Sequence, residues 1–206
     1  TWISQYKAQH DGQMPDSTDR NNYNNIVEQF IVESNPDAIR KTQNNIEMVD
    51  QREPGVVLAD GRIIDGNRRF TCLRRLTQKN DRFGYFETVI LDRNIENNAK
   101  QIKMLELSIQ HGEESKVDYN PIDRLVGIYN DIISTHLLSV EEYARSTNES
   151  ESDVKKRISI AMLMTEFLEF INAPEQFYIA RDLQIYFPLE ELLKLTKKCR
   201  TEDEVE

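Results

Sequence analysis

The sequence contains few of the residues that turn-rich folds, metal clusters and membrane spans need. Its 206 residues include only 7 Gly and 6 Pro, which argues against a sandwich or barrel with many tight turns. Cys72 and Cys199, its 2 cysteines, lie far apart and match no metal-ligand spacing, so we expect a reduced, cytoplasmic setting. No apolar run is long enough to cross a bilayer, and no membrane partner is expected.

Charge is plentiful but unevenly distributed. The formal net charge is -10, and a chain this acidic repels the phosphate backbone of nucleic acids over most of its surface. Residues 62–82 are the exception, because seven basic residues there outnumber two aspartates. The seven are Arg62, Arg68, Arg69, Arg74, Arg75, Lys79 and Arg82. An anion-binding surface is therefore expected in this stretch.

Three regions follow one another along the chain. Residues 1–34 form a polar N-terminal arm: residues 1–25, rich in Asn and Asp, predict a loose segment with at most one short helix, and residues 26–31 fit a helix or an edge strand. Residues 35–115 alternate helical patterns with short strands expected at 56–58, 62–65 and 88–91. Residues 116–200 read as helix throughout. We therefore predict an α+β fold, in which a small sheet-and-helix domain precedes an all-helical domain.

The turn at residues 65–69 has the parts of a phosphate site. Asp60-Gly61 predicts a hairpin whose second strand ends at Gly66, and a helical pattern starts at Asn67. Glycine lets a ligand approach the backbone, and free N–H groups at a helix start favour anions. Arg68 and Arg69 add guanidinium groups that bind phosphate oxygens in pairs. The alternative is that both arginines are simply solvated at an exposed helix start.

Residues 57–73 resemble the hairpin of ParB-type proteins and the Gly-Glu-Arg-Arg phosphate motif that follows it. Pro54 matches the Gln-Pro that precedes this hairpin, with Glu53 in place of Gln. The resemblance to the ParB/sulfiredoxin-like superfamily implies a CTP-like nucleoside triphosphate held by Gly66, Asn67, Arg68 and Arg69. The turn has no cysteine, so sulfiredoxin chemistry is not expected. It also resembles the Asp-Gly-Gln-Gln-Arg motif of related nucleases.

The resemblance extends past the turn. Residues 119–123, Tyr-Asn-Pro-Ile-Asp, resemble the Leu-Asn-Pro-Ile-Glu that opens the next ParB helix. The second phosphate motif of that family, Glu-Asn-x-x-Arg, corresponds here to residues 112–116, where only Lys116 can replace the Arg. Glu113 or Glu114 could supply a carboxylate for Mg²⁺. Alternatively, both glutamates lie in a solvated loop.

A helix-turn-helix is predicted at residues 139–161. Ser139 caps a short helix, Asn148 suits a left-handed turn, and Ser150 or Ser152 caps a second helix. Residues 154–158, Val-Lys-Lys-Arg-Ile, resemble the Val-x-x-Arg-Leu of the ParB central domain, and in all the resemblance covers roughly residues 35–195.

DNA contacts are predicted at the start of the second helix. The candidates are Ser150, Ser152, Lys155 and Lys156. Acidic residues at the same helix start oppose this interpretation, since phosphates repel Glu149, Glu151 and Asp153. The alternative is a packing unit that binds no DNA.

Three functions remain open from the sequence. The first is a ParB-like, DNA-associated protein of the plasmid or chromosome partition type, with nucleotide and DNA as partners and a homodimer as its assembly. The second is an enzyme, a ParB-like nuclease or phosphotransferase, with Asp65 as general base. The ordinary role of Asp65 would be to close the turn by a hydrogen bond to a backbone N–H. The third is a protein-interaction module with a vestigial helix-turn-helix.

Overall fold

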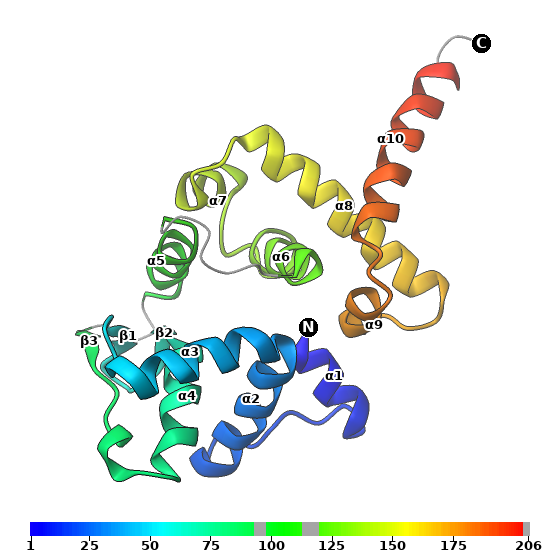
Figure 1. The fold of residues 1–206 in the computed structure, drawn as a ribbon. Coiled ribbons are helices and arrows are strands. Elements are labelled where there is room, and N and C mark those ends of the chain that lie inside the picture. The colour runs from blue at the N-terminus through cyan, green and yellow to red at the C-terminus, as the bar shows by residue number, and fades with distance from the viewer. Residues whose placement is uncertain (93–97, 113–119, 204–206) are drawn as a thin grey trace. The chain divides into compact units, whose positions relative to one another are not determined.

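The computed structural model describes residues 1–92, 98–112 and 120–203. Within them the chain forms ten α-helices and a sheet of three short strands, which confirms the mixed α+β prediction (Figure 1). It divides into two compact units, which we call the sheet unit, residues 15–106, and the helical unit, residues 1–14 with 107–206. No helix in the described ranges is both long and apolar enough to span a membrane.

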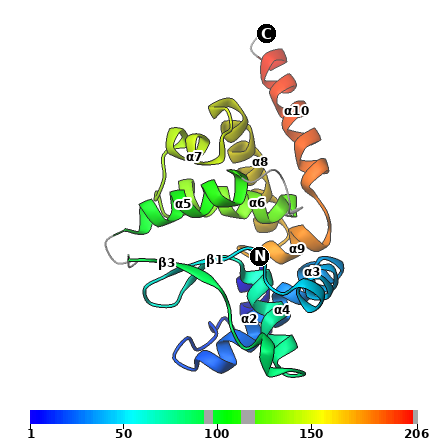
Figure 2. The same ribbon diagram turned by 60° about the vertical axis from the view of Figure 1, so that its left-hand side comes forward.

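The sheet is built around its middle strand, β1 (Gly55–Leu58). It pairs antiparallel with β2 (Ile63–Asp65) and parallel with β3 (Thr88–Leu91), as seen edge-on in Figure 2. Gly61 supplies the left-handed turn between β1 and β2, at a φ of 86°. The predicted hairpin and third strand are therefore confirmed.

Three helices complete the packing of the sheet unit: α2 (Arg20–Ser34), α3 (Pro36–Val49) and α4 (Asn67–Thr77). A 3₁₀ turn, η1 (Asp81–Phe83), follows α4. Their shared core consists of Ile39, Ile46, Cys72, Leu73, Leu76 and Phe83. Burial raises the pKa of the Cys72 thiol to about 11, so this cysteine is a small core residue, as its sequence context suggested.

The polar arm, residues 1–34, contains two helices, a short one at its start and a longer one that includes residues 26–31. The Asp19 carboxylate accepts a hydrogen bond from the Asn22 N–H and so caps α2, whose apolar Ile31 and Val32 pack on the core of the sheet unit. Helix α1 (Trp2–Gln9) packs on α9 (Phe177–Asp182) in the helical unit. The high Asn content obscured α2, whose packing and capping outweigh its weak local propensity.

The helical unit is a set of helices around one apolar core. Its remaining helices are α6 (Pro121–Ile128), continued by the π-helical turn η2 (Tyr129–Ser134), α7 (Val140–Thr147), α8 (Glu151–Phe170) and α10 (Tyr186–Asp203). Helix α5 (Ala99–Gly112) crosses the division between the two units. The core includes Ile122, Leu125, Ile160, Met164, Leu168 and Leu189, all buried.

The predicted helix-turn-helix is formed by α7 and α8. Ser139 Oγ accepts from the Glu142 N–H, and the Glu142 carboxylate accepts from the Ser139 N–H, so the start of α7 is doubly capped. Asn148 ends α7 in the left-handed conformation, at φ 54° and ψ 41°, and Ser150 caps α8. Buried Ala144 lies where the two helices contact each other.

The left-handed turn gives a direct test of this motif. Asn148→Gly should leave stability nearly unchanged, because glycine adopts positive φ freely. Asn148→Ala should lower the free energy of unfolding by about 1 kcal/mol, since a Cβ without a compensating polar group disfavours that conformation. Thermal or urea unfolding of both variants measures the difference. Equal stability of the two would mean that the turn has another conformation.

Candidate phosphate-binding site

The turn between β2 and α4 requires glycine. Gly66 has a φ of 97° and forms the N-cap of α4. A Cβ at this position would lie 2.9 Å from Cζ of Phe86 and 3.2 Å from the Cα of Gly55, so neither the backbone angle nor the space admits a side chain. The backbone of the turn is thereby held in a single arrangement.

The start of α4 lacks the side-chain cap found on several other helices. Asp19, Asn35, Asn120, Ser139 and Ser150 cap α2, α3, α6, α7 and α8 with their own oxygen atoms. Gly66 has no oxygen to offer, and α4 has no side-chain cap. The first N–H groups of an α-helix have no partner within the helix, so they remain available to an anion.

Arg69, predicted to grip phosphate, is held by two carboxylates. Its Nη1 donates to Glu53 Oε2 at 2.9 Å, and its Nη2 donates to Asp65 Oδ2 at 2.6 Å. Nη2 also lies 3.4 Å from the carbonyl oxygen of Pro54. The guanidinium therefore ties the residues before β1 to the end of β2, and its charge is already balanced.

Arg68 is placed differently from its neighbour. It lies in the first turn of α4, is half-buried, and has no ion pair within the described residues. Asn67 precedes it and is exposed. The anion site that the turn can offer is therefore the Gly66–Asn67 backbone with the Arg68 guanidinium.

Much of the basic stretch 62–82 is neutralised or engaged locally. Arg62 pairs with Asp60, and Arg74 pairs with Glu28 and donates to the Asn25 side chain. Arg82 donates to the carbonyl of Glu47 and lies over the Phe83 ring. The net positive charge counted along the sequence thus overstates the charge that a ligand would meet.

Asp65, the candidate general base, has its carboxylate on Arg69 rather than on the backbone N–H groups of the turn. Lys116, Glu113 and Glu114 lie outside the described residues. In the part of the chain that the structure describes, no three His, Cys, Asp or Glu side chains are grouped so that they could hold a metal ion.

The candidate DNA-binding residues lie at the start of α8. Ser150 Oγ caps that helix and donates to the Asp153 carboxylate. Lys155 pairs with Glu151 at 2.9 Å, and Lys156 pairs with Glu190 of α10. Ser152, Lys155, Lys156, Ser159 and Lys197 line one shallow groove on this surface.

A half-buried charge network next to this surface was not predicted from the sequence. Both oxygens of Glu149 accept hydrogen bonds from Arg157 at 2.6 Å, and one also pairs with Arg124 at 3.1 Å. Arg124 in turn lies 3.4 Å from Nε2 of His111, and burial together with this guanidinium lowers the pKa of His111. Glu149, named in the sequence as an acid that would repel DNA, instead pairs with Arg157 and Arg124 and so links the turn to α6.

No protein-family model matches this chain, and no curated protein matches it. The residues of the site therefore carry the functional argument.

The Glu149 network predicts a stability change with a defined pH dependence. Burial is the largest single influence on this carboxyl and raises its pKa, but the hydrogen bonds and charge of Arg157, with Thr147 and Arg124, together outweigh burial and lower the pKa below the ordinary 4.5. Its contribution to stability is thus fully present above pH 4.5 and is lost as the pH falls through the lowered value. At pH 7, Glu149→Gln should reduce the free energy of unfolding by on the order of 2 kcal/mol.

Urea unfolding of both proteins between pH 7 and pH 3 measures this effect. The gap between wild type and Glu149→Gln should narrow below pH 4.5. Glu166→Gln, an exposed change on α8, serves as the control and should be neutral at every pH. A difference in the free energy of unfolding that stays constant to pH 3 would contradict a lowered pKa of Glu149 as the source of the effect.

Proposed function

We propose that this chain is a ParB-like protein that binds the phosphates of a nucleoside triphosphate at the start of α4. The observation that carries the proposal is the uncapped helix start at Gly66 with Arg68 beside it. Backbone N–H groups, the helix dipole and an unpaired guanidinium all favour the same ligand, a multiply charged anion.

Arg69 has a positioning role in this proposal. By bridging Glu53 and Asp65, it fixes the two chain segments on either side of the turn. The two carboxylates also require that a phosphate approach from the side of Arg68, since they would repel it elsewhere. Gly66 and Arg68 are then the residues that contact the ligand.

The proposed family assignment rests on the order of motifs together with this geometry. A hairpin, a glycine turn, an arginine-bearing helix, an Asn-Pro helix start and a helix-turn-helix occur in the same order as in ParB proteins. CTP as the nucleotide and Mg²⁺ as its companion follow from the resemblance, as do partition, a homodimer and a cytoplasmic location.

DNA binding is a second candidate function. It is supported by α7 and α8, two helices that are each capped by a serine and that contact each other. The groove with Lys155, Lys156 and Lys197 lies at the exposed start of α8, where a recognition helix meets DNA. Both Lys155 and Lys156 would have to exchange a glutamate for a phosphate. We therefore expect weak binding to random duplex and a shallow salt dependence.

An enzymatic role is less well supported than binding. A general base needs a carboxylate that can reach a substrate, whereas the Asp65 carboxylate accepts a hydrogen bond from Arg69 at 2.6 Å. A nuclease or phosphotransferase function, and a protein-interaction role for a vestigial helix-turn-helix, remain alternatives that the assays below separate.

Loss of Arg68 should weaken triphosphate binding. Arg68→Ala removes a charge-assisted contact worth about 1.5–3 kcal/mol, so the Kd for CTP with Mg²⁺ should rise roughly tenfold to hundredfold. Isothermal titration with the four nucleoside triphosphates and with inorganic triphosphate measures the effect and separates recognition of the base from that of phosphate. Hydrolysis and nuclease assays on the same samples, with Asp65→Ala, address the enzymatic alternatives.

Arg75→Ala is the matched control, because Arg75 lies in the last turn of the same helix. It should leave the affinity unchanged. If Arg68→Ala and Arg75→Ala bind triphosphate equally well, or if wild type binds none, the phosphate site does not exist.

The DNA proposal has its own test. Replacing both Lys155 and Lys156 by Ala should lower the slope of log affinity against log salt by up to about two units on a preferred fragment. Fluorescence titration of genomic fragments, with and without nucleotide, provides the measurement. Lys194→Ala, which removes another glutamate-paired lysine of the same unit, is the control. Finding no fragment preferred over random duplex would favour the protein-interaction alternative.

A further inference from the structure

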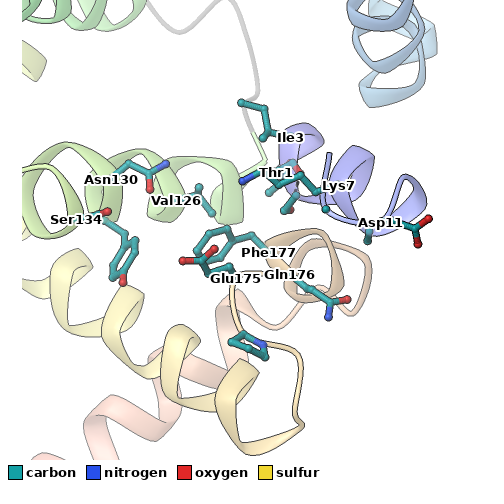
Figure 3. Close-up of a pocket in the computed structure, with 15 residues that line it drawn as sticks. Thr1, Ile3, Lys7, Asp11, Val126, Asn130, Ser134, Glu175, Gln176 and Phe177 are labelled. Atoms are coloured by element: carbon teal, nitrogen blue, oxygen red, sulfur yellow. Dashed lines mark hydrogen bonds between the residues drawn. The ribbon is translucent and has the colours of Figure 1, made fainter. Parts of the chain in front are cut away.

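The helical unit contains a cavity of about 550 Å³, a size typical of small-molecule sites. All its lining residues belong to this unit, whereas the turn at Gly66 belongs to the sheet unit. Three stretches form its walls: α1 with the turn after it, residues 126–134, and residues 174–177 before α9. Figure 3 shows Lys7 on α1 and Asp11 in the turn after it, Val126 and Asn130 on the opposite wall, and Phe177 between them.

One part of the wall is apolar and aromatic. The rings of Tyr129 and Phe177 lie 6.0 Å apart between centroids and are tilted by 56°, and Val126 is buried beside them. Pro174 and Ile3 extend the apolar surface. Such a surface favours the hydrocarbon or aromatic body of a ligand.

The rest of the wall carries charged side chains that form no ion pair with other described residues. Lys7, Asp11 and Glu175 line the cavity, and none of the three has an ion pair among the residues described. Some other exposed charges of the same unit are paired, such as Lys194 with Glu191 and Lys155 with Glu151. The cavity therefore offers one ammonium and two carboxylates to an occupant.

The backbone around the cavity is also unusual. Asp11 and Glu175 have φ values of 50° and 60°, in the left-handed region that side chains rarely adopt. The opposite wall includes the π-helical turn η2, which is closed by a hydrogen bond from the Thr135 N–H to the Asn130 carbonyl. Strained residues and π-helical turns are enriched at functional sites. Their presence here agrees with a ligand site, which the side chains of the cavity indicate.

We propose that this cavity is a second ligand site, for a small zwitterion with an apolar or aromatic side chain, such as a free α-amino acid. The ligand's carboxylate pairs with Lys7 and its ammonium group with Glu175 or Asp11. Its side chain packs on Tyr129 and Phe177. A cavity with charges of both signs and an aromatic wall suits a zwitterion with an apolar side chain. A pure anion would leave the carboxylates without a partner, and a hydrocarbon would leave every charge without one.

L-Phenylalanine is the first probe, titrated into the intact chain by calorimetry or followed by ligand-observed NMR. Two analogues test the two charged groups of the ligand separately: N-acetyl-L-phenylalanine lacks the ammonium group, and L-phenylalaninamide lacks the carboxylate. L-Leucine and L-lysine compare an aliphatic side chain with a charged one. We expect L-phenylalanine and L-leucine to bind, and each of the other three to bind at least about tenfold more weakly.

Variants link that binding to the cavity. Glu175→Gln and Lys7→Gln should each raise the Kd for L-phenylalanine about tenfold or more, since each removes one charge-assisted contact. Glu166→Gln and Lys41→Gln, exposed changes outside the cavity, should leave it unchanged. Absence of binding by L-phenylalanine and L-leucine at millimolar concentration would overturn the proposal. Binding that is indifferent to both cavity variants would overturn it as well.

Discussion

The ring of Phe86 against two glycines is the contact on which the candidate phosphate site depends. A Cβ on Gly55 would lie 2.3 Å from its Cζ, and one on Gly66 would lie 2.9 Å away. The ring therefore occupies space that exists only because neither residue has a side chain. It brings together the start of β1, the turn before α4 and the segment leading into β3. Close packing of this kind keeps the backbone N–H groups of the turn in place without a capping oxygen.

Several arginines of this molecule are tied into the scaffold by paired charges. Arg69 is shared between Glu53 and Asp65, Glu149 is shared between Arg157 and Arg124, and Arg74 pairs with Glu28. These arginines serve as cross-links between segments distant in sequence. Arg68 and the three charged residues of the helical-unit cavity have no such partner among the described residues.

Features with a local signal were predictable from the sequence, and features that depend on distant partners were not. Asp60-Gly61, Asn120-Pro121 and Asn148 each carry their own conformational preference, so the hairpin, the start of α6 and the helix-turn-helix were all foreseen. The glycine turn was located for the same reason. The bridge of Arg69 to Glu53 spans 16 positions, and the packing of α1 on α9 spans far more, so no local pattern could reveal them.

The position of α1 has a consequence for how this chain is made. Tyr178 and Arg181 hydrogen-bond Ser4 and Gln5 across separations of 174 and 176 residues, while the whole sheet unit lies between them in the sequence. On a ribosome adding roughly 5–20 residues per second, α1 therefore waits on the order of ten seconds or more for its partner. The sheet unit can fold during that interval, and the helical unit is completed last by a long-range closure that rejoins two ends of one domain.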